Sequence, residues 1–183
     1  MEKKTKGFQT SDLAYVAVCA VLTAVCSWIS IPAAVPFTLQ TFAVFCSLGL
    51  LGGRRGTAAI LVYLLLGALG IPVFAGFSGG IGVLFGTTGG YLLGFILMGL
   101  IYWLGERLIR DSRGVRIVSM ILGLLLCYAF GTAWFMFVYA RQSGAIALGT
   151  ALSWCVIPFL LPDLIKLGLA LLLTDRLRRA LRL

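Results

Sequence analysis

The sequence predicts an all-α integral membrane protein, a bundle of six transmembrane helices with both termini in the cytoplasm. Of its 183 residues, 61% are hydrophobic and only 11% are charged, whereas soluble domains carry about 25% charged residues. A soluble domain of this length could not hide so much apolar surface from water. The apolar residues also fall into runs, and the basic residues gather in the gaps between the runs. Lipid is therefore the predicted solvent for most of the chain.

Each apolar run is predicted to form one helix, and residues 1–183 are predicted to form a single membrane domain. A polar, basic segment at residues 1–10 precedes the first run. That run is interpreted as a retained helix, because it is longer than the apolar part of a signal peptide and no A-x-A site follows it. Most runs approach the roughly 20 residues that a spanning helix needs, and the second is the shortest. The runs cover residues 13–31, 37–51, 57–74, 91–104, 115–139 and 147–174.

The positions of the lysines and arginines predict the orientation of the bundle. If six helices alternate, 13 of the 15 basic residues lie in gaps on one side of the membrane, and only Arg141 lies in a gap on the other. Lys166 is the remaining one and lies inside the sixth run. Basic loops stay in the cytoplasm, so both termini are predicted to lie there. The protein itself is predicted to lie in the cell membrane. The net charge of +9 is thus explained by topology, and no DNA-binding signature accompanies it.

The residue types argue against an enzyme or a metalloprotein. The chain has no histidine, and its five cysteines lie in apolar stretches without a C-x-x-C pair. Histidine is the commonest metal ligand and a common general base. Apart from one aspartate, the acidic residues lie near the predicted membrane edges, at Glu2, Asp12, Glu106, Asp111 and Asp175. We therefore predict no catalytic residue, no metal site, no cofactor and no nucleic-acid partner.

The long gap at residues 70–90 is rich in glycine and carries no charge. Long connections in compact proteins are usually functional. Glycine allows a backbone to turn tightly and to approach a ligand closely. Irregular backbone at membrane depth survives only where it is buried or lines a cavity. We expect this segment to dip into the outer side of the bundle.

Two opposite charges lie within the sixth run. Asp163 and Lys166 are three residues apart, so they share a face of the helix. Charged residues inside spanning helices are costly and usually mark a route or site for a ligand or ion. One alternative is an ion pair that only locks two helices together. Another is a proton relay, but a single acid without histidine offers few groups to pass a proton along. The favoured reading is an apolar pocket with a few polar groups that binds a small polar solute from outside.

Five segments of the sequence resemble the BioY family, the biotin-specific substrate-binding subunits (S components) of energy-coupling factor transporters. The resemblance extends over nearly the whole chain and implies a six-helix membrane subunit that captures biotin from outside. It also implies two kinds of partner, a transmembrane coupling subunit and a pair of cytoplasmic ATPases. The segments are PFTLQTF (36–42), GLLGGRRG (49–56), YLLLGALGIPVFAG (63–76), SGGIGVLFGTTGGYLLGF (78–95) and IPFLLPDLIKLGLA (157–170).

The resemblance also implies roles for the charged pair and for one outer loop. Asp163 is expected to accept an N–H group from the ureido ring of biotin. Lys166 is expected to orient Asp163 and to contact the ureido oxygen or the valerate. Gln40 and Thr38, in the first outer loop, are expected to close over the ligand, although simple loop polarity explains them equally well.

Two positions depart from the pattern of some relatives. Ser78 stands where some have an asparagine, and its hydroxyl reaches less far. Leu92 stands where some have an arginine after G-G-Y, so Tyr91 or a backbone N–H group is expected to meet the carboxylate instead.

The family also places small alanines of the first helix against the coupling subunit. Ala20 and Ala24 match that A-x-x-x-A pattern, which allows close helix approach but equally suits packing inside the bundle.

Several other functions stay open at this stage. An S component for another vitamin would use the same scaffold, and a carrier for a small solute other than a vitamin is a further alternative. A small membrane enzyme would need a nucleophile, base or metal facing one pocket. A purely structural helical protein would leave the Asp163–Lys166 pair unexplained.

Overall fold

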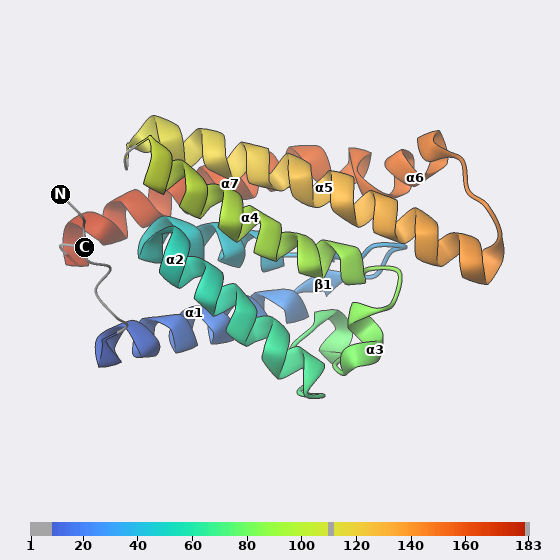
Figure 1. Ribbon diagram of the computed structural model, residues 1–183, viewed down its shortest axis with the longest axis horizontal. Helices are drawn as coiled ribbons and strands as arrows, with labels where there is room; N and C mark the ends of the chain where they lie inside the picture. Colours follow the sequence, from blue (N-terminus) through green and yellow to red (C-terminus); the bar gives the residue numbers. More distant parts are fainter. Residues whose placement is uncertain (1–8, 110–111, 182–183) are drawn as a thin grey trace.

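The computed structural model describes residues 9–109 and 112–181, so most of the basic segment predicted at residues 1–10 lies outside the described residues. Long helices run side by side along one axis, and the short elements gather mostly at one end of the bundle (Figure 1). The helices are α1 (Thr10–Trp28), α2 (Gln40–Ala68), α3 (Ile81–Leu84), α4 (Gly89–Leu108), α5 (Arg113–Ser143), α6 (Leu148–Cys155) and α7 (Ile157–Leu181), with a 3-10 turn η1 (Ala75–Phe77) and the strands β1 (Ser30–Ile31) and β2 (Phe37–Thr38).

The predicted all-α membrane class is confirmed at the level of several spanning helices. Within the described residues, five helical segments are long and apolar enough to cross a bilayer. Four of them are α1, α2, α4 and α5, and the fifth covers α6 and α7 as Leu148–Ala180. The runs predicted as separate helices at 37–51 and 57–74 supply the two arms of α2, which are separated by a kink at Gly52.

The two arms of α2 meet at Gly52 without an intervening loop. Gly52 has φ 77° and ψ 173°, a backbone conformation that interrupts the helix and that glycine adopts without steric cost. The next N–H group, on Gly53, donates to Glu106 Oε2 at 2.6 Å, so a side chain of α4 caps the second arm. The G-G-R-R-G stretch predicted as a connection therefore contains the break between two helical arms, although only Gly52 leaves helical angles.

The last predicted run, at residues 147–174, is split into two helices. It forms two helices, α6 and α7, because the backbone departs from helical angles at Val156, with φ −125° and ψ −55°. Pro158 follows in the first turn of α7, where a missing N–H group costs little. Pro162 lies further inside α7, where it removes one helical hydrogen bond.

The glycine-rich segment alternates between the surface and the inside of the bundle. Val73 and Phe74 are buried, whereas Phe77, Ile81 and Phe85 are exposed. Phe74 packs against the backbone of Gly67, where any larger residue would collide with its ring. The predicted dip into the bundle is therefore present for the first part of the segment.

One end of the bundle, which we call the basic end, is held together by charged contacts. Arg55 of α2 pairs with Asp12 at the start of α1, with 3.1 Å between Nη2 and Oδ1. Arg113 and Arg116 at the start of α5 each pair with Asp175 near the end of α7, at 3.2 Å. The start of α1 and the end of α7 lie together at this end, away from α3 and α6 (Figure 1).

Helices α4 and α5 approach each other closely through glycines on both sides. A Cβ atom on Gly94 of α4 would lie 2.7 Å from Cys127 Sγ, and one on Gly123 of α5 would lie 3.0 Å from Met98 Cα. Gly90 and Gly131 meet Trp134 and Tyr91 in the same way. Small residues at helix contacts let backbones approach closely in membranes, so these glycines set the spacing of α4 and α5.

Replacing Gly94 by leucine is expected to force these helices apart. Overpacking of this kind costs about 1–3 kcal/mol, so Gly94→Leu should lower the midpoint of thermal unfolding of the purified protein in detergent. Gly168→Leu on α7 is the matched control, because no atom lies within 4 Å of a Cβ built there. Equal midpoints for the two variants would contradict the role assigned to the α4–α5 contact.

Candidate functional site

A cavity of about 200 Å³ lies between the helices in the half of the bundle away from the basic end. Its walls come from β2, from the starts of α2 and α4, from the middle of α5 and from α6 and α7. Most of the lining is apolar, including Phe74, Phe95, Leu124 and Phe159. The polar groups on its wall are Thr38, Gln40, Thr41, Ser78, Thr88, Tyr91, Tyr128, Asp163 and Lys166.

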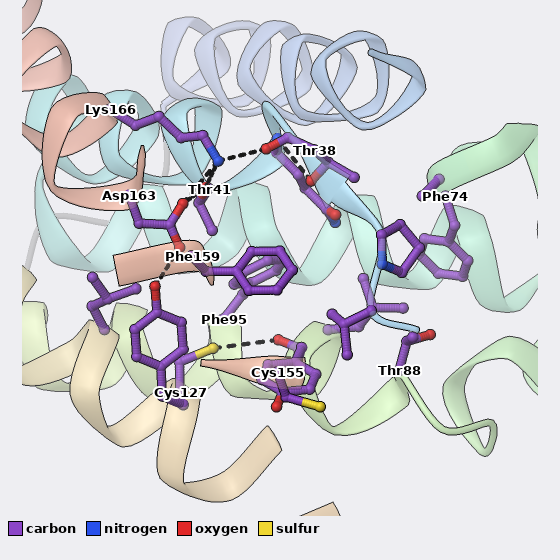
Figure 2. A pocket seen from close by; sticks show the side chains of 18 of the residues that line it. Thr38, Thr41, Phe74, Thr88, Phe95, Cys127, Cys155, Phe159, Asp163 and Lys166 are labelled. Carbon is purple, nitrogen blue, oxygen red and sulfur yellow. Dashed lines mark hydrogen bonds and ion pairs between the residues drawn. The ribbon is translucent and has the colours of Figure 1, made fainter. Parts of the chain in front are cut away.

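Asp163 and Lys166 form a buried ion pair on α7, at one side of this cavity (Figure 2). Lys166 Nζ lies 2.8 Å from Asp163 Oδ1, and the two residues are 5% and 2% exposed. Removing one member of a buried pair typically costs 3–5 kcal/mol, because it strands the other charge. The pair therefore needs further polar partners, and three other elements supply them.

Three donors hold the carboxylate of Asp163. Oδ1 accepts from Lys166 and from the hydroxyl of Thr41 at 2.9 Å, and Oδ2 accepts from the hydroxyl of Tyr128 at 2.6 Å. A carboxylate offers about four lone-pair positions. The protein occupies three, so one acceptor position on Oδ2 is left on a residue that lines the cavity.

Lys166 belongs to the same hydrogen-bond network and has two acceptors besides Asp163. Besides Asp163, its Nζ donates to the backbone oxygen of Thr38 at 2.7 Å and to Thr41 Oγ1 at 3.2 Å. The ammonium group also lies 4.2 Å from the centre of the Phe37 ring, a cation–π contact. Lys166 thus ties strand β2 and the start of α2 to α7.

The other polar residues of the wall are bonded mainly to the protein itself. Gln40 is buried, and its Nε2 donates to Tyr63 Oη at 2.7 Å. Tyr91 Oη pairs with Thr132 Oγ1 at 2.9 Å. Ser78 Oγ donates to the backbone oxygen of Ala75 at 2.8 Å. These bonds fix the side-chain orientations while leaving lone pairs that can accept from a ligand.

The structure brings the predicted pocket residues to one place. Asp163, Lys166, Gln40, Ser78 and Tyr91 all line the cavity, although they come from four separate parts of the chain. Their role toward a ligand stays a prediction.

The sequence analysis missed two of the groups that hold Asp163, namely Thr41 and Tyr128. Thr41 lies within the P-F-T-L-Q-T-F segment that was singled out, so its presence there was a usable sign. Tyr128 is a polar residue in an otherwise apolar stretch of the fifth run, which was the only sign that pointed to it.

Ala20 and Ala24 lie elsewhere, on the inner face of α1. They are 1% and 6% exposed and belong to the hydrophobic core. The exposed face of α1 carries Val18, Val21 and Val25 instead. In this structure the two alanines pack inside the bundle, which the A-x-x-x-A pattern equally allows.

Among the described residues, no group of three or more histidine, cysteine or acidic side chains could hold a metal ion. The buried cysteines of the cavity wall, Cys127 and Cys155, are separate thiols. The polar and apolar residues of the cavity wall can supply hydrogen bonds and apolar contacts.

Comparisons with known proteins identify the family. A model of the BioY family matches residues 1–183. The biotin transporter BioY of Thermotoga maritima is 44% identical over 160 residues, which cover 86% of this chain and 90% of the relative. The probable biotin transporter BioY of Pyrococcus horikoshii is 39% identical, over 93% of this chain and 98% of the relative.

A solved structure has the same arrangement of helices. It is the crystal structure at 2.1 Å of the S-component for biotin from an ECF-type ABC transporter, with a TM-score of 0.79 and 26% sequence identity. The alignment covers 94% of this chain and 95% of that one. The family match, the identities and the shared fold agree, and the chain belongs to the BioY family.

Proposed function

We propose that this chain is a biotin-binding membrane subunit that captures biotin from outside the cell and passes it inward with an ATP-driven coupling module. The observation that carries the proposal is the buried carboxylate of Asp163, held by Lys166, Thr41 and Tyr128 on the wall of an apolar cavity. The names of the relatives, which are biotin transporters, support the choice of ligand.

The ureido ring of biotin suits the acceptor that remains on Asp163. This ring carries two N–H donors, and a hydrogen bond to an ionised acceptor is stronger than one between neutral groups. In the proposed complex one N–H group donates to Asp163 Oδ2. Bonds from Lys166, Thr41 and Tyr128 hold the carboxylate in place before the ligand arrives, so little ordering cost falls on binding.

The sulfur-containing ring and the aliphatic chain of biotin suit the rest of the cavity. Phe95, Leu124 and Phe159 supply apolar surface beside the charged pair, and burial of apolar area contributes roughly 25 cal/mol per Å². Gln40, Ser78 and Tyr91 are proposed to bind polar atoms of the ligand at the same wall. Lys166 is proposed to act mainly by holding Asp163 and Thr38.

We further propose six membrane crossings with both termini in the cytoplasm. Each arm of α2 is then one crossing, although the arm before Gly52 has only about 12 residues and a length of about 18 Å. The ion pairs that gather the arginines at the basic end support a cytoplasmic location for that end. The cavity then opens to the outside.

The proposed partners are a transmembrane coupling subunit and a pair of cytoplasmic ATPases. The solved relative is the S-component of an ECF-type transporter, which supports a partnership of this kind. The interface predicted at Ala20 and Ala24 remains a prediction with a condition attached. Because both residues are buried, α1 would have to turn or separate from its neighbours before they could contact a partner.

Replacing Asp163 by asparagine is expected to weaken biotin binding by roughly 10- to 100-fold, because a hydrogen bond to a charged group contributes about 1.5–3 kcal/mol. Equilibrium binding of tritiated biotin to the purified chain in detergent measures this. Asp175→Asn is the matched control, since it makes the same chemical change at the basic end, where Asp175 pairs with Arg113 and Arg116.

Two outcomes would contradict the proposal in different ways. Unchanged affinity in Asp163→Asn would remove Asp163 from the binding site while leaving biotin as the ligand. A folded parent chain that binds no biotin would refute the ligand, and thiamine and riboflavin would be tested next.

The orientation is tested with two reporters fused to the C-terminus in a bacterial host. Green fluorescent protein folds and fluoresces in the cytoplasm, whereas alkaline phosphatase is active only outside it. We expect fluorescence from the first fusion and no phosphatase activity from the second. The reverse pattern would overturn the proposed arrangement, because it would place the C-terminus outside the cytoplasm.

A further inference from the structure

All three N–H groups of Lys166 are engaged within the protein. An ammonium group has three donors and no acceptor. Its three acceptors here are the backbone oxygen of Thr38 at 2.7 Å, Asp163 Oδ1 at 2.8 Å and Thr41 Oγ1 at 3.2 Å. The Phe37 ring covers a further side of the group at 4.2 Å. A ligand could gain a hydrogen bond from Lys166 only by breaking one of these.

The charge on the cavity wall is balanced before any ligand binds. Among the described residues that line the cavity, only Asp163 and Lys166 are charged, and they neutralise each other. A ligand carboxylate brought to this side would meet the charge of Asp163 and a cation whose donors are occupied. A second carboxylate beside Asp163 would be repelled, because like charges at short range repel each other.

The far side of the cavity offers only neutral polar groups. Thr88 and Phe74 lie on the side away from Asp163 and Lys166 (Figure 2). Ser78 and Thr88 line the cavity, and Thr88 is the residue before the first turn of α4. A hydroxyl group can donate to a carboxylate, to an amide oxygen or to an ester oxygen.

We propose that the cavity recognises the neutral ureido head of its ligand at Asp163 and places the acid end toward Thr88 without a positively charged partner. This rests on the proposed biotin function and deepens it. The substrate class then includes neutral derivatives of the acid, so that biotin carboxamide and biotin methyl ester bind about as well as biotin itself.

The carboxamide gives the sharper comparison, because it has nearly the same shape as the carboxylate and differs in charge. The full-length chain is purified in detergent and loaded with tritiated biotin, which is displaced by unlabelled biotin, by its carboxamide or by its methyl ester. We expect the affinities for biotin and the carboxamide to agree within about threefold. A positively charged partner for the acid would instead favour biotin by roughly 10- to 100-fold.

Leu92 offers a way to add the missing charge. It lines the cavity, is 7% exposed and lies one helical turn after Thr88 on α4. Leu92→Lys is expected to bind biotin at least about tenfold better than the carboxamide, whereas Leu92→Met, which adds no charge, should keep the ratio near one. Thr88→Lys at the neighbouring position serves if Leu92→Lys does not fold.

The outcomes separate this inference from the proposed function. Binding of biotin with a carboxamide affinity more than about tenfold weaker in the parent chain would overturn the inference and leave the biotin function standing. An unchanged ratio in both lysine variants would overturn the placement of the acid end beside Thr88 and Leu92. Absence of biotin binding by the folded parent would overturn both proposals together.

Discussion

The buried ion pair of Asp163 and Lys166 is the constraint on which the half of the molecule around the cavity depends. Two charges with almost no access to solvent are tolerable only if nearly every donor and acceptor finds a partner. Thr41, Thr38 and Tyr128 are those partners, and they come from α2, β2 and α5. The pair on α7 therefore determines where three other elements must lie, and the cavity is the space that remains among them.

The glycine contact between α4 and α5 also supports this arrangement, because it positions α5 and its Tyr128. Close approach at Gly94 and Gly123 holds α5 against α4, and the hydroxyl of Tyr128 on α5 reaches Asp163. The same approach sets the position of Tyr91, whose ring lies against Gly131. Backbone spacing and side-chain chemistry thus act on the same few residues, so a change in helix distance would alter the hydrogen bonds at the site.

The sequence was informative where local rules decide the outcome. Composition and the spacing of charge predicted a helical membrane protein, and the three-residue spacing of Asp163 and Lys166 predicted that they share a helix face. It was silent where distant contacts decide. The cap that Glu106 provides for the second arm of α2 comes from 53 residues further along the chain, and the bond from Tyr128 to Asp163 spans 35 residues. The A-x-x-x-A spacing of Ala20 and Ala24 does not say which way that face of α1 points, and both residues are buried.

The ion pairs at the basic end have a mechanical consequence. They bind α1 to α2 and α5 to α7 at one end of the bundle, whereas the opposite end contains the cavity and the short irregular segments. Helices fastened at one end behave like levers, so a small rotation about the fastened end becomes a larger displacement at the other. A rotation about the basic end would thus widen the cavity while the ion pairs at that end stay closed.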